Sequence, residues 1–176
     1  MKNITKLFSV LVLIFLIFSS AGCGYSRQTV IPGNLKTIYV ETFKNKIPID
    51  AIYAYEPGLE IKITNAVIRR LHRDGNLKVV SREEADAVLE GDLIEFSQGG
   101  LRFTGLERIE EYRLFVVVAL TLREVKTGKV LWEEQNFSGD ESYFVTGSRA
   151  GSLGDAADKA IDSLARNVVD RITEDW

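Results

Sequence analysis

Five stretches of the sequence have the pattern of β-strands, in which apolar and polar residues alternate or β-branched and aromatic residues predominate. The predicted strands are Leu35–Phe43, Leu77–Ser81, Ala85–Phe96, Tyr112–Glu124 and Val130–Asp140. The fourth of these is the most apolar of the set. The pattern therefore predicts a sheet that forms most of the fold.

The last two strands are joined by Lys126-Thr127-Gly128-Lys129, a sequence typical of a tight turn. They are predicted to form an antiparallel hairpin. Ser97–Gly100 is predicted to interrupt the strand before them, and Leu101–Glu110 to continue as a long connection without a regular pattern. Lys44–Pro57 contains two prolines and is predicted to separate the first strand from the next element.

A helix is predicted after Pro57, because apolar residues recur at helical spacing at Leu59, Ile63, Val67 and Leu71. Gly75 comes next, at a position typical of a helix end. The segment from Leu59 to Ile63 alone also alternates like a strand, so its local pattern permits both structures. The longer periodicity favours the helix.

A second helix is predicted from Ser152, which is followed three residues later by Asp155 in a pattern resembling a capping box. One apolar stripe runs along it, formed by Ala157, Ala160, Ile161, Leu164, Ala165, Val168 and Ile172. Together the elements predict an α+β fold, a mixed, mainly antiparallel β-sheet with two α-helices packed on one face. The other face would remain exposed or meet a partner, and residues 35–176 would form one domain.

Residues 1–22 have the features of an export signal. Lys2 and Lys6 precede the apolar run Leu7–Phe18, which is too short for the roughly 20 residues of a membrane span. Ser20-Ala21-Gly22-Cys23 then resembles a bacterial lipobox, although Ser20 stands where an aliphatic residue is usual. The resemblance implies that Cys23 carries diacylglycerol and becomes the mature N-terminus, with residues 23–34 as a tether.

The residue after the cysteine, Gly24, is not aspartate, which among sorted lipoproteins resembles the outer-membrane pattern. Removal of residues 1–22 would take away two lysines and no acids, leaving 154 residues with 20 basic and 25 acidic side chains. The alternative to a lipid-anchored protein is an ordinary secreted protein with one unpaired cysteine.

The composition excludes several classes of function. One cysteine excludes an intramolecular disulfide and a four-thiolate metal site, and a formal net charge of -3 disfavours binding to duplex nucleic acid. His72 is the only histidine, and no nucleophile motif or phosphate-binding glycine loop is present. We therefore predict no enzymatic activity, no cofactor and no metal.

Three arginines are predicted to meet at the end of the sheet opposite the Lys126–Lys129 turn. They are Arg102, Arg108 and Arg149, and aromatic residues lie near them in sequence. Guanidinium groups bind phosphate and aromatic rings contact acyl chains, so this end is a candidate site for an anionic amphiphile. Ordinary solvated loop charges are the alternative.

Several short motifs occur in an order and spacing that resembles one family. They are Cys23-Gly24-Tyr25, Tyr39–Phe43 before Lys44-Asn45-Lys46, Glu111-Tyr112-Arg113, and Thr127-Gly128-Lys129-Val130-Leu131-Trp132. The family is that of the lipopolysaccharide-assembly lipoproteins, LptE. The resemblance implies a non-enzymatic lipoprotein on the periplasmic side of the outer membrane.

Such a protein would plug and help assemble the LptD β-barrel and assist lipopolysaccharide insertion into the outer leaflet. Its partners would be an LptD-type barrel and lipopolysaccharide, the latter bound near Arg102, Arg108 and Arg149. A different class stays open, a stand-alone envelope lipoprotein that acts as a periplasmic scaffold or small-ligand binding module.

Overall fold

The structure is a computed structural model and describes residues 35–48 and 57–173. The predicted signal segment, Cys23 and the tether lie outside the described residues. In chain order the elements are β1 (Thr37–Val40), β2 (Lys44–Asn45), α2 (Leu59–Asp74), β3 (Lys78–Val79), the 3₁₀ helix η2 (Arg82–Glu84), β4 (Ala87–Phe103), β5 (Ile109–Glu124), β6 (Val130–Phe144) and α3 (Leu153–Thr173).

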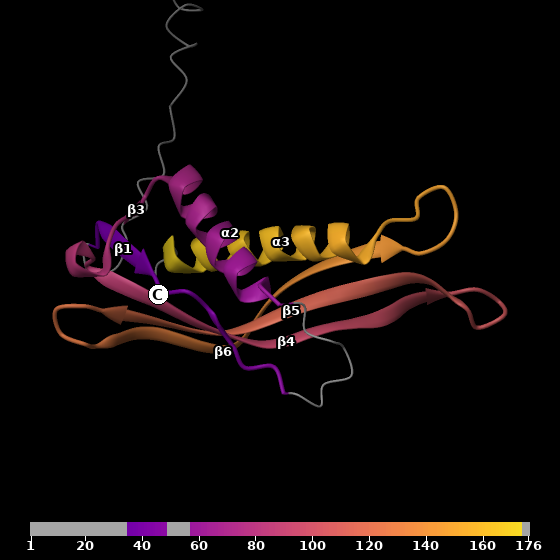
Figure 1. Ribbon diagram of the computed structural model, residues 1–176, viewed down its shortest axis with the longest axis horizontal. Helices are drawn as coiled ribbons and strands as arrows, with labels where there is room; N and C mark the ends of the chain where they lie inside the picture. Colours follow the sequence, from indigo (N-terminus) through magenta and orange to yellow (C-terminus); the bar gives the residue numbers. More distant parts are fainter. Residues whose placement is uncertain (1–34, 49–56, 174–176) are drawn as a thin grey trace, which may run out of the picture.

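The strands of the described segments form one six-stranded sheet in the order β3-β1-β4-β5-β6, with β2 pairing to β4 beside β1. β1 is parallel to β3 and β4, whereas the long strands β4, β5 and β6 are antiparallel. Both helices lie on one face of this sheet, and α2 crosses over α3 (Figure 1). The predicted α+β fold is thereby confirmed.

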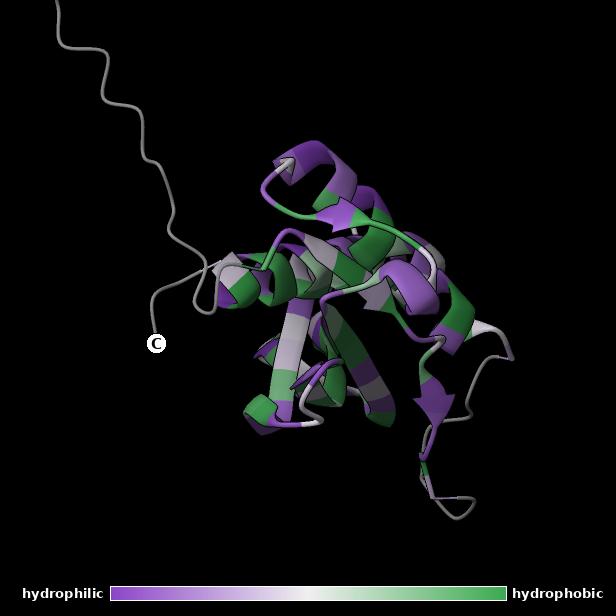
Figure 2. Cartoon of the chain, turned by 90° about the vertical axis from the view of Figure 1, so that its left-hand side faces the viewer, coloured by the Kyte–Doolittle hydropathy of each residue, from purple (hydrophilic) through white to green (hydrophobic). Residues whose placement is uncertain are grey.

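The core lies between the helices and the sheet. Along β5, every second residue from Leu114 to Leu122 is buried, and these side chains face the helices. The apolar stripe of α3 is buried as its spacing predicts, from Ala156 to Ile172. Hydrophobic and hydrophilic residues interleave along the helices in the end-on view of Figure 2, because each helix buries only one face.

Two glycines let neighbouring elements approach the sheet closely. A Cβ atom at Gly139 of β6 would lie 2.4 Å from the carbonyl oxygen of Ala160 and 2.3 Å from the backbone nitrogen of Leu164. A Cβ atom at Gly91 of β4 would overlap the Phe43 ring, at 1.6 Å. Glycine at these positions therefore sets how near α3 and the segment after β1 lie to the sheet.

The helix ends agree with local signals in the sequence. Gly75 adopts a left-handed conformation with φ of 77° after α2, and its N–H donates to the Leu71 carbonyl. At the start of α3, the Asp155 N–H donates to Ser152 Oγ at 3.0 Å, and the Ser152 hydroxyl donates to the Asp155 carboxylate at 2.8 Å. Both helix boundaries match the sequence prediction.

The prediction for residues 97–110 was wrong. β4 continues without interruption to Phe103, and only five residues, 104–108, connect it to β5. Gly99 and Gly100 pair with Arg113 and Tyr112 of β5, so cross-strand hydrogen bonding overrides the weak strand propensity of glycine. β6 also extends past the predicted Asp140 to Phe144.

The strand β2 was not predicted, because its two residues lie in a segment punctuated by prolines. It forms by parallel pairing with Asp92 and Leu93 of β4. β1 and β3 occupy the central parts of their predicted ranges.

The sheet face away from the helices carries mixed polar and apolar side chains. On β5 it presents Arg113, Phe115, Val117, Ala119, Thr121 and Arg123. Two ion pairs cross it, Arg113 with Asp140 at 2.8 Å and Arg123 with Glu90 at 3.6 Å. Among the described residues, neither helix combines the length and apolar composition needed to cross a membrane.

Candidate functional site at the Phe144 end of the sheet

Two of the three predicted arginines converge on one aromatic ring at the end of β6. The guanidinium carbon of Arg149 lies 4.4 Å from the centroid of the Phe144 ring, and that of Arg102 lies 5.6 Å from it. Cations at such distances are attracted by the π face of the ring. We call the surroundings of this ring the Phe144 end; it comprises residues 98–113 and 141–153.

The backbone fixes the positions of both arginines. Phe144 is the last residue of β6 and pairs with Glu111 of β5, and Glu111 in turn pairs with Arg102 of β4. After β6 the chain folds back, the Gly151 N–H donates to the Phe144 carbonyl at 2.8 Å, and Phe144 and Ala150 form a bridge. This return brings the adjacent Arg149 over the ring.

A buried carboxylate accompanies the arginines. Glu111 is only 7% exposed, and its Oε2 lies 3.3 Å from Nε of Arg102. The ion pair offsets one of the two guanidinium charges on the ring, and Arg149 forms no ion pair with any described residue. The three charged groups at the ring therefore sum to one positive charge, whereas the Phe144 end as a whole carries four arginines and four glutamates.

The structure places Arg108 apart from this ring cluster, in the turn between β4 and β5. That turn is ordered by Thr104, whose N–H donates to the Arg108 carbonyl at 2.8 Å and whose hydroxyl accepts the N–H groups of Leu106 and Arg108. Within the described segments, no ion pair or ring contact includes the Arg108 guanidinium. The three arginines thus share one end of the sheet, but only two share a ring.

Exposed apolar side chains gather at the same end. Five of the eight large hydrophobic residues that are exposed in the described part of the chain lie there: Leu101, Phe103, Leu106, Val145 and Leu153. Leu106, at the tip of the hairpin, is 79% exposed. Apolar surface beside guanidinium groups suits a ligand that has both an acyl part and an anionic part.

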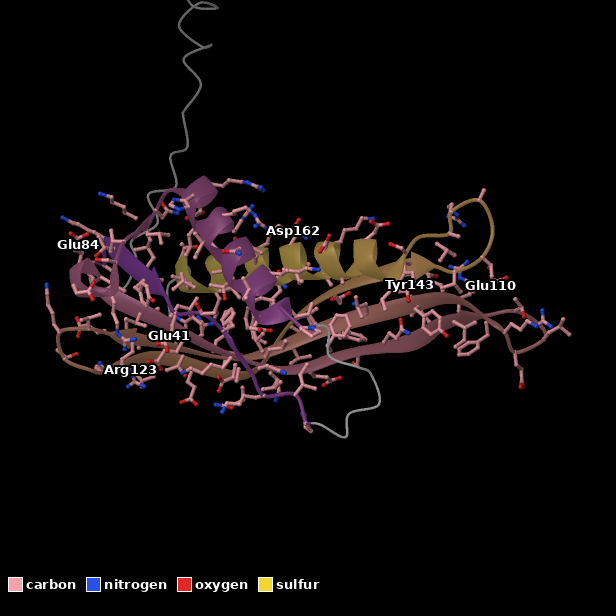
Figure 3. All side chains as sticks on the ribbon, viewed as in Figure 1. Glu41, Glu84, Glu110, Arg123, Tyr143 and Asp162 are labelled. Carbon is pink, nitrogen blue, oxygen red and sulfur yellow. The ribbon has the colours of Figure 1, made fainter. Side chains whose placement is uncertain are left out.

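Aromatic residues make the base of this end rigid. The rings of Tyr112 and Tyr143 stack across β5 and β6 with centroids 5.9 Å apart, and the Tyr143 hydroxyl donates to Gln98 Oε1 at 2.5 Å. Figure 3 shows Tyr143 and Glu110 at this end of the long strands. The sequence did not predict the exposed Leu101 and Leu106, because they were assigned to an irregular connection rather than to the tip of a hairpin.

The metal-ligand and acid–base candidates of the described residues can be placed in the fold. Within residues 35–48 and 57–173, no group of three or more His, Cys, Asp or Glu side chains is placed to hold a metal ion. His72 lies on the exposed face of the last turn of α2, far from the Phe144 end in the fold. The adjacent glutamates Glu133 and Glu134 pair with different neighbours along β5, Thr121 and Leu120.

The Phe144 end and the start of the described chain lie at opposite ends of the molecule. Ala87, the first residue of β4, pairs with Ile38 of β1, whereas the last residue of β4, Phe103, pairs with Ile109 beside the hairpin tip. At about 3.3 Å per residue, the 17 residues of β4 span about 50 Å. Figure 1 shows β1 and the hairpin tip at the two ends of the long axis.

The fold defines a class of protein, an α+β domain in which two helices cover one face of a long, mainly antiparallel sheet. Comparison with family models identifies the family. The model of the family LptE, described as lipopolysaccharide-assembly, matches residues 35–175. The chain belongs to the LptE family, as the order of its sequence motifs predicted.

Solved structures share the fold at low sequence identity. A lipoprotein B from Nitrosomonas europaea has a TM-score of 0.55 at 12% identity, with 79% of this chain and 83% of that chain covered. A protein from Xanthomonas campestris has a TM-score of 0.54 at 11% identity, covering 78% and 82%. The PelC dodecamer from Paraburkholderia phytofirmans has a TM-score of 0.50 at 20% identity, covering 80% and 88%.

A search of curated proteins found no match to the sequence.

Proposed function

We propose that this protein is a non-enzymatic outer-membrane lipoprotein that plugs an LptD-type β-barrel, helps the barrel to assemble, and assists lipopolysaccharide insertion into the outer leaflet. Its membership of the lipopolysaccharide-assembly family carries the proposal. Three features of the structure support it, namely the Phe144 end, the length of the sheet and the polarity of its open face.

The Phe144 end has the chemistry that lipopolysaccharide requires. Lipopolysaccharide carries phosphate groups and acyl chains, and the end offers Arg102 and Arg149 beside exposed leucines. Guanidinium groups bind phosphate through two parallel hydrogen bonds. The Phe144 ring contacts both arginines, and Glu111 also pairs with Arg102, so both guanidinium groups lie beside one another at this end.

The length of the sheet suits a protein that starts at one membrane surface and acts at the other. β4 spans about 50 Å, whereas the hydrocarbon core of a bilayer is about 30 Å thick. With the tether at the β1 end anchored in the inner leaflet, a domain standing in a barrel lumen would carry the Phe144 end toward the outer leaflet.

The open sheet face has the polarity of a surface that meets a barrel interior. It presents paired charges, Arg113 with Asp140 and Arg123 with Glu90, interspersed with apolar side chains such as Val117 and Ala119. The lumen of an outer-membrane barrel is polar, so such a face makes contacts there without a large apolar patch.

Membrane attachment would depend on Cys23. We propose that its thiol is joined to diacylglycerol after export and that residues 1–22 are then removed. Cys23→Ser should abolish lipid labelling and leave the precursor uncleaved by the lipoprotein signal peptidase. Normal processing of that variant would show an ordinary signal peptide instead.

The ligand proposal is tested by measuring lipopolysaccharide binding to the full lipoprotein in a neutral detergent. We expect Arg102→Gln with Arg149→Gln to weaken binding at least tenfold, and Arg108→Gln to weaken it less because Arg108 does not reach the ring. The matched control is Arg82→Gln with Arg123→Gln, which removes two arginines from the opposite end of the sheet.

Circular dichroism should show that both double variants remain folded. Equal binding by the parent and the Arg102/Arg149 variant would remove the Phe144 end as the site. Equal weakening in the control would mean that net charge alone governs binding.

A further inference from the structure

A hollow of about 60 Å³ between the two helices is lined by four arginines. Arg69, Arg70 and Arg73 come from the last two turns of α2, and Arg166 comes from α3. The lining is completed by two small residues and one acid, Ala66, Ala165 and Asp162. Figure 3 shows Asp162 at the place where α2 crosses α3.

The sequence builds this hollow from two helix faces that meet at alanines. Ala66 and Ala165 are each 3% exposed, and their small side chains let the helices pack closely. Residues three, four and seven positions after Ala66 lie on the same face of α2, and all three are arginines. Arg166 comes directly after Ala165, so the close packing of the alanines brings its guanidinium to the same hollow.

The charges of this arginine cluster are poorly balanced by protein carboxylates. Among the described residues, the four arginines form one ion pair, between Arg70 Nη2 and Asp170 Oδ1 at 3.6 Å. Arg70 Nε is enclosed and has no hydrogen-bond acceptor in the described part of the chain. A buried donor without an acceptor destabilises the fold, so an additional acceptor at this place would be stabilising.

The helix dipole explains only part of the cluster. Cations in the last turn of α2 are favoured by the partial negative charge at that helix end, which accounts for Arg73 and, to a lesser degree, for Arg69 and Arg70. Arg166 lies seven residues before the last residue of α3, where the dipole effect has fallen away. Four arginines against the carboxylates of Asp162 and Asp170 leave an excess of positive charge, which an anion bound between the helices would reduce.

We propose that this hollow binds a phosphate group, either that of a lipid headgroup or free inorganic phosphate. A phosphate offers several charged oxygens, so guanidinium groups from both helices can bind it at once. The overall negative charge of the chain would not draw anions to its surface in general, so attraction at this place is local. The site lies in the helix layer and does not depend on the function proposed for the Phe144 end.

The test is calorimetric titration of the full lipoprotein in a neutral detergent with two probes. One probe is inorganic phosphate, and the other is micelles of the same detergent doped with phosphatidylglycerol. We expect saturable binding that Arg69→Gln with Arg166→Gln weakens at least tenfold. Arg70 is left unchanged, because its ion pair with Asp170 joins the two helices.

The matched control is again Arg82→Gln with Arg123→Gln, which should change binding by less than twofold. Tighter binding to the doped micelles identifies a lipid headgroup, and tighter binding to inorganic phosphate identifies a small anion; both results support the site. Absence of saturable binding with both probes, or equal weakening in the control, overturns it. Lipopolysaccharide binding at the Phe144 end should be unaffected by the Arg69/Arg166 change, which separates the two proposals.

Discussion

The carboxylate of Glu111 lies 3.3 Å from Nε of Arg102, although Glu111 is almost completely buried. This pair holds Arg102 against the Phe144 ring and also cancels one of the positive charges there. Glu111→Gln keeps the size of the side chain and removes that cancellation. We expect lipopolysaccharide to bind about fivefold more tightly, which corresponds to about 1 kcal/mol of Coulomb energy at a partly exposed site.

The binding measurement is made at low and at high salt, because the gain should shrink as salt screens the charges. Glu90→Gln, which releases Arg123 at the opposite end of the sheet, is the control and should leave binding unchanged. Weaker binding by Glu111→Gln would mean that the carboxylate matters mainly for positioning Arg102 rather than for the local charge.

A second prediction concerns the contact between Gly139 and α3. Gly139→Ala places a Cβ atom 2.3–2.4 Å from backbone atoms of Leu164 and Ala160, which cannot move without shifting the helix. We expect the free energy of unfolding to fall by about 1–3 kcal/mol, the usual cost of overpacking. Urea denaturation monitored by circular dichroism measures the change.

Gly99→Ala is the matched control for this experiment. Gly99 also lies within a long strand, but a Cβ atom there meets no atom within 4 Å. Its substitution should leave the unfolding midpoint nearly unchanged. Similar losses in the two variants would contradict the proposed close packing of α3 on β6.

A third prediction concerns the buried hydroxyl of Thr64. Thr64 Oγ1 accepts the Phe43 N–H at 3.0 Å and donates to the Glu60 carbonyl at 2.7 Å, so it joins α2 to the segment after β1. Thr64→Val keeps the shape but leaves the buried Phe43 N–H without an acceptor. We expect a loss of about 1–3 kcal/mol in unfolding free energy, measured by urea denaturation.

Thr64→Ser retains the hydroxyl and should keep more of the stability than Thr64→Val does. The opposite order would show that the methyl group, rather than the hydrogen bonds, is the important part of Thr64.

A fourth prediction is a dependence of stability on pH through Asp86. Hydrogen bonds from the Lys36 N–H and the Thr37 hydroxyl, with a smaller effect of the Lys126 charge, hold the pKa of Asp86 below its usual range. A carboxylate with a lowered pKa stabilises the fold above its unfolded pKa of about 3.9, and this contribution is lost as pH falls through the folded value. Asp86→Asn should therefore be less stable than the parent at pH 7 and closer to it at low pH.

Unfolding midpoints measured between pH 7 and pH 3 test this prediction. Asp92→Asn changes a nearby carboxylate within β4, one that forms no ion pair within the described residues, and is the control, in which we expect no comparable convergence. A difference between Asp86→Asn and the parent that stays constant down to low pH would contradict the role of the ionised carboxylate.

Local signals in the sequence were sufficient to predict the two helices and the β5–β6 hairpin. Their periodicity, the capping residues Ser152 and Gly75 and the turn at Gly128 each lie within a short stretch of sequence. Local signals did not predict the structure where it is decided by pairing with a strand that is distant in the sequence. β2 forms by pairing with β4, and pairing with β5 holds Gly99 and Gly100 in an extended conformation.

The candidate site was likewise predictable from the sequence only in part. Hairpin topology predicts that Arg102, Arg108 and Arg149 share one end, because a turn at one end of two strands sends their other termini to the opposite end. The convergence of Arg149 on Phe144 depends on the return of the loop after β6, which no short motif specifies. The arginine cluster between the helices depends on their crossing, which no short stretch of sequence specifies.

The central claim is that this lipoprotein works in complex with an LptD-type β-barrel, and affinity capture tests it most directly. The full lipoprotein is captured from outer membranes solubilised in a mild detergent, and the proteins bound to it are identified by mass spectrometry. We predict that a large β-barrel protein is recovered in about equal molar amount and that lipopolysaccharide is recovered with it. Recovery of the lipoprotein alone, with normal lipopolysaccharide display after its deletion, would show that it does not act with such a barrel and would favour a stand-alone envelope lipoprotein.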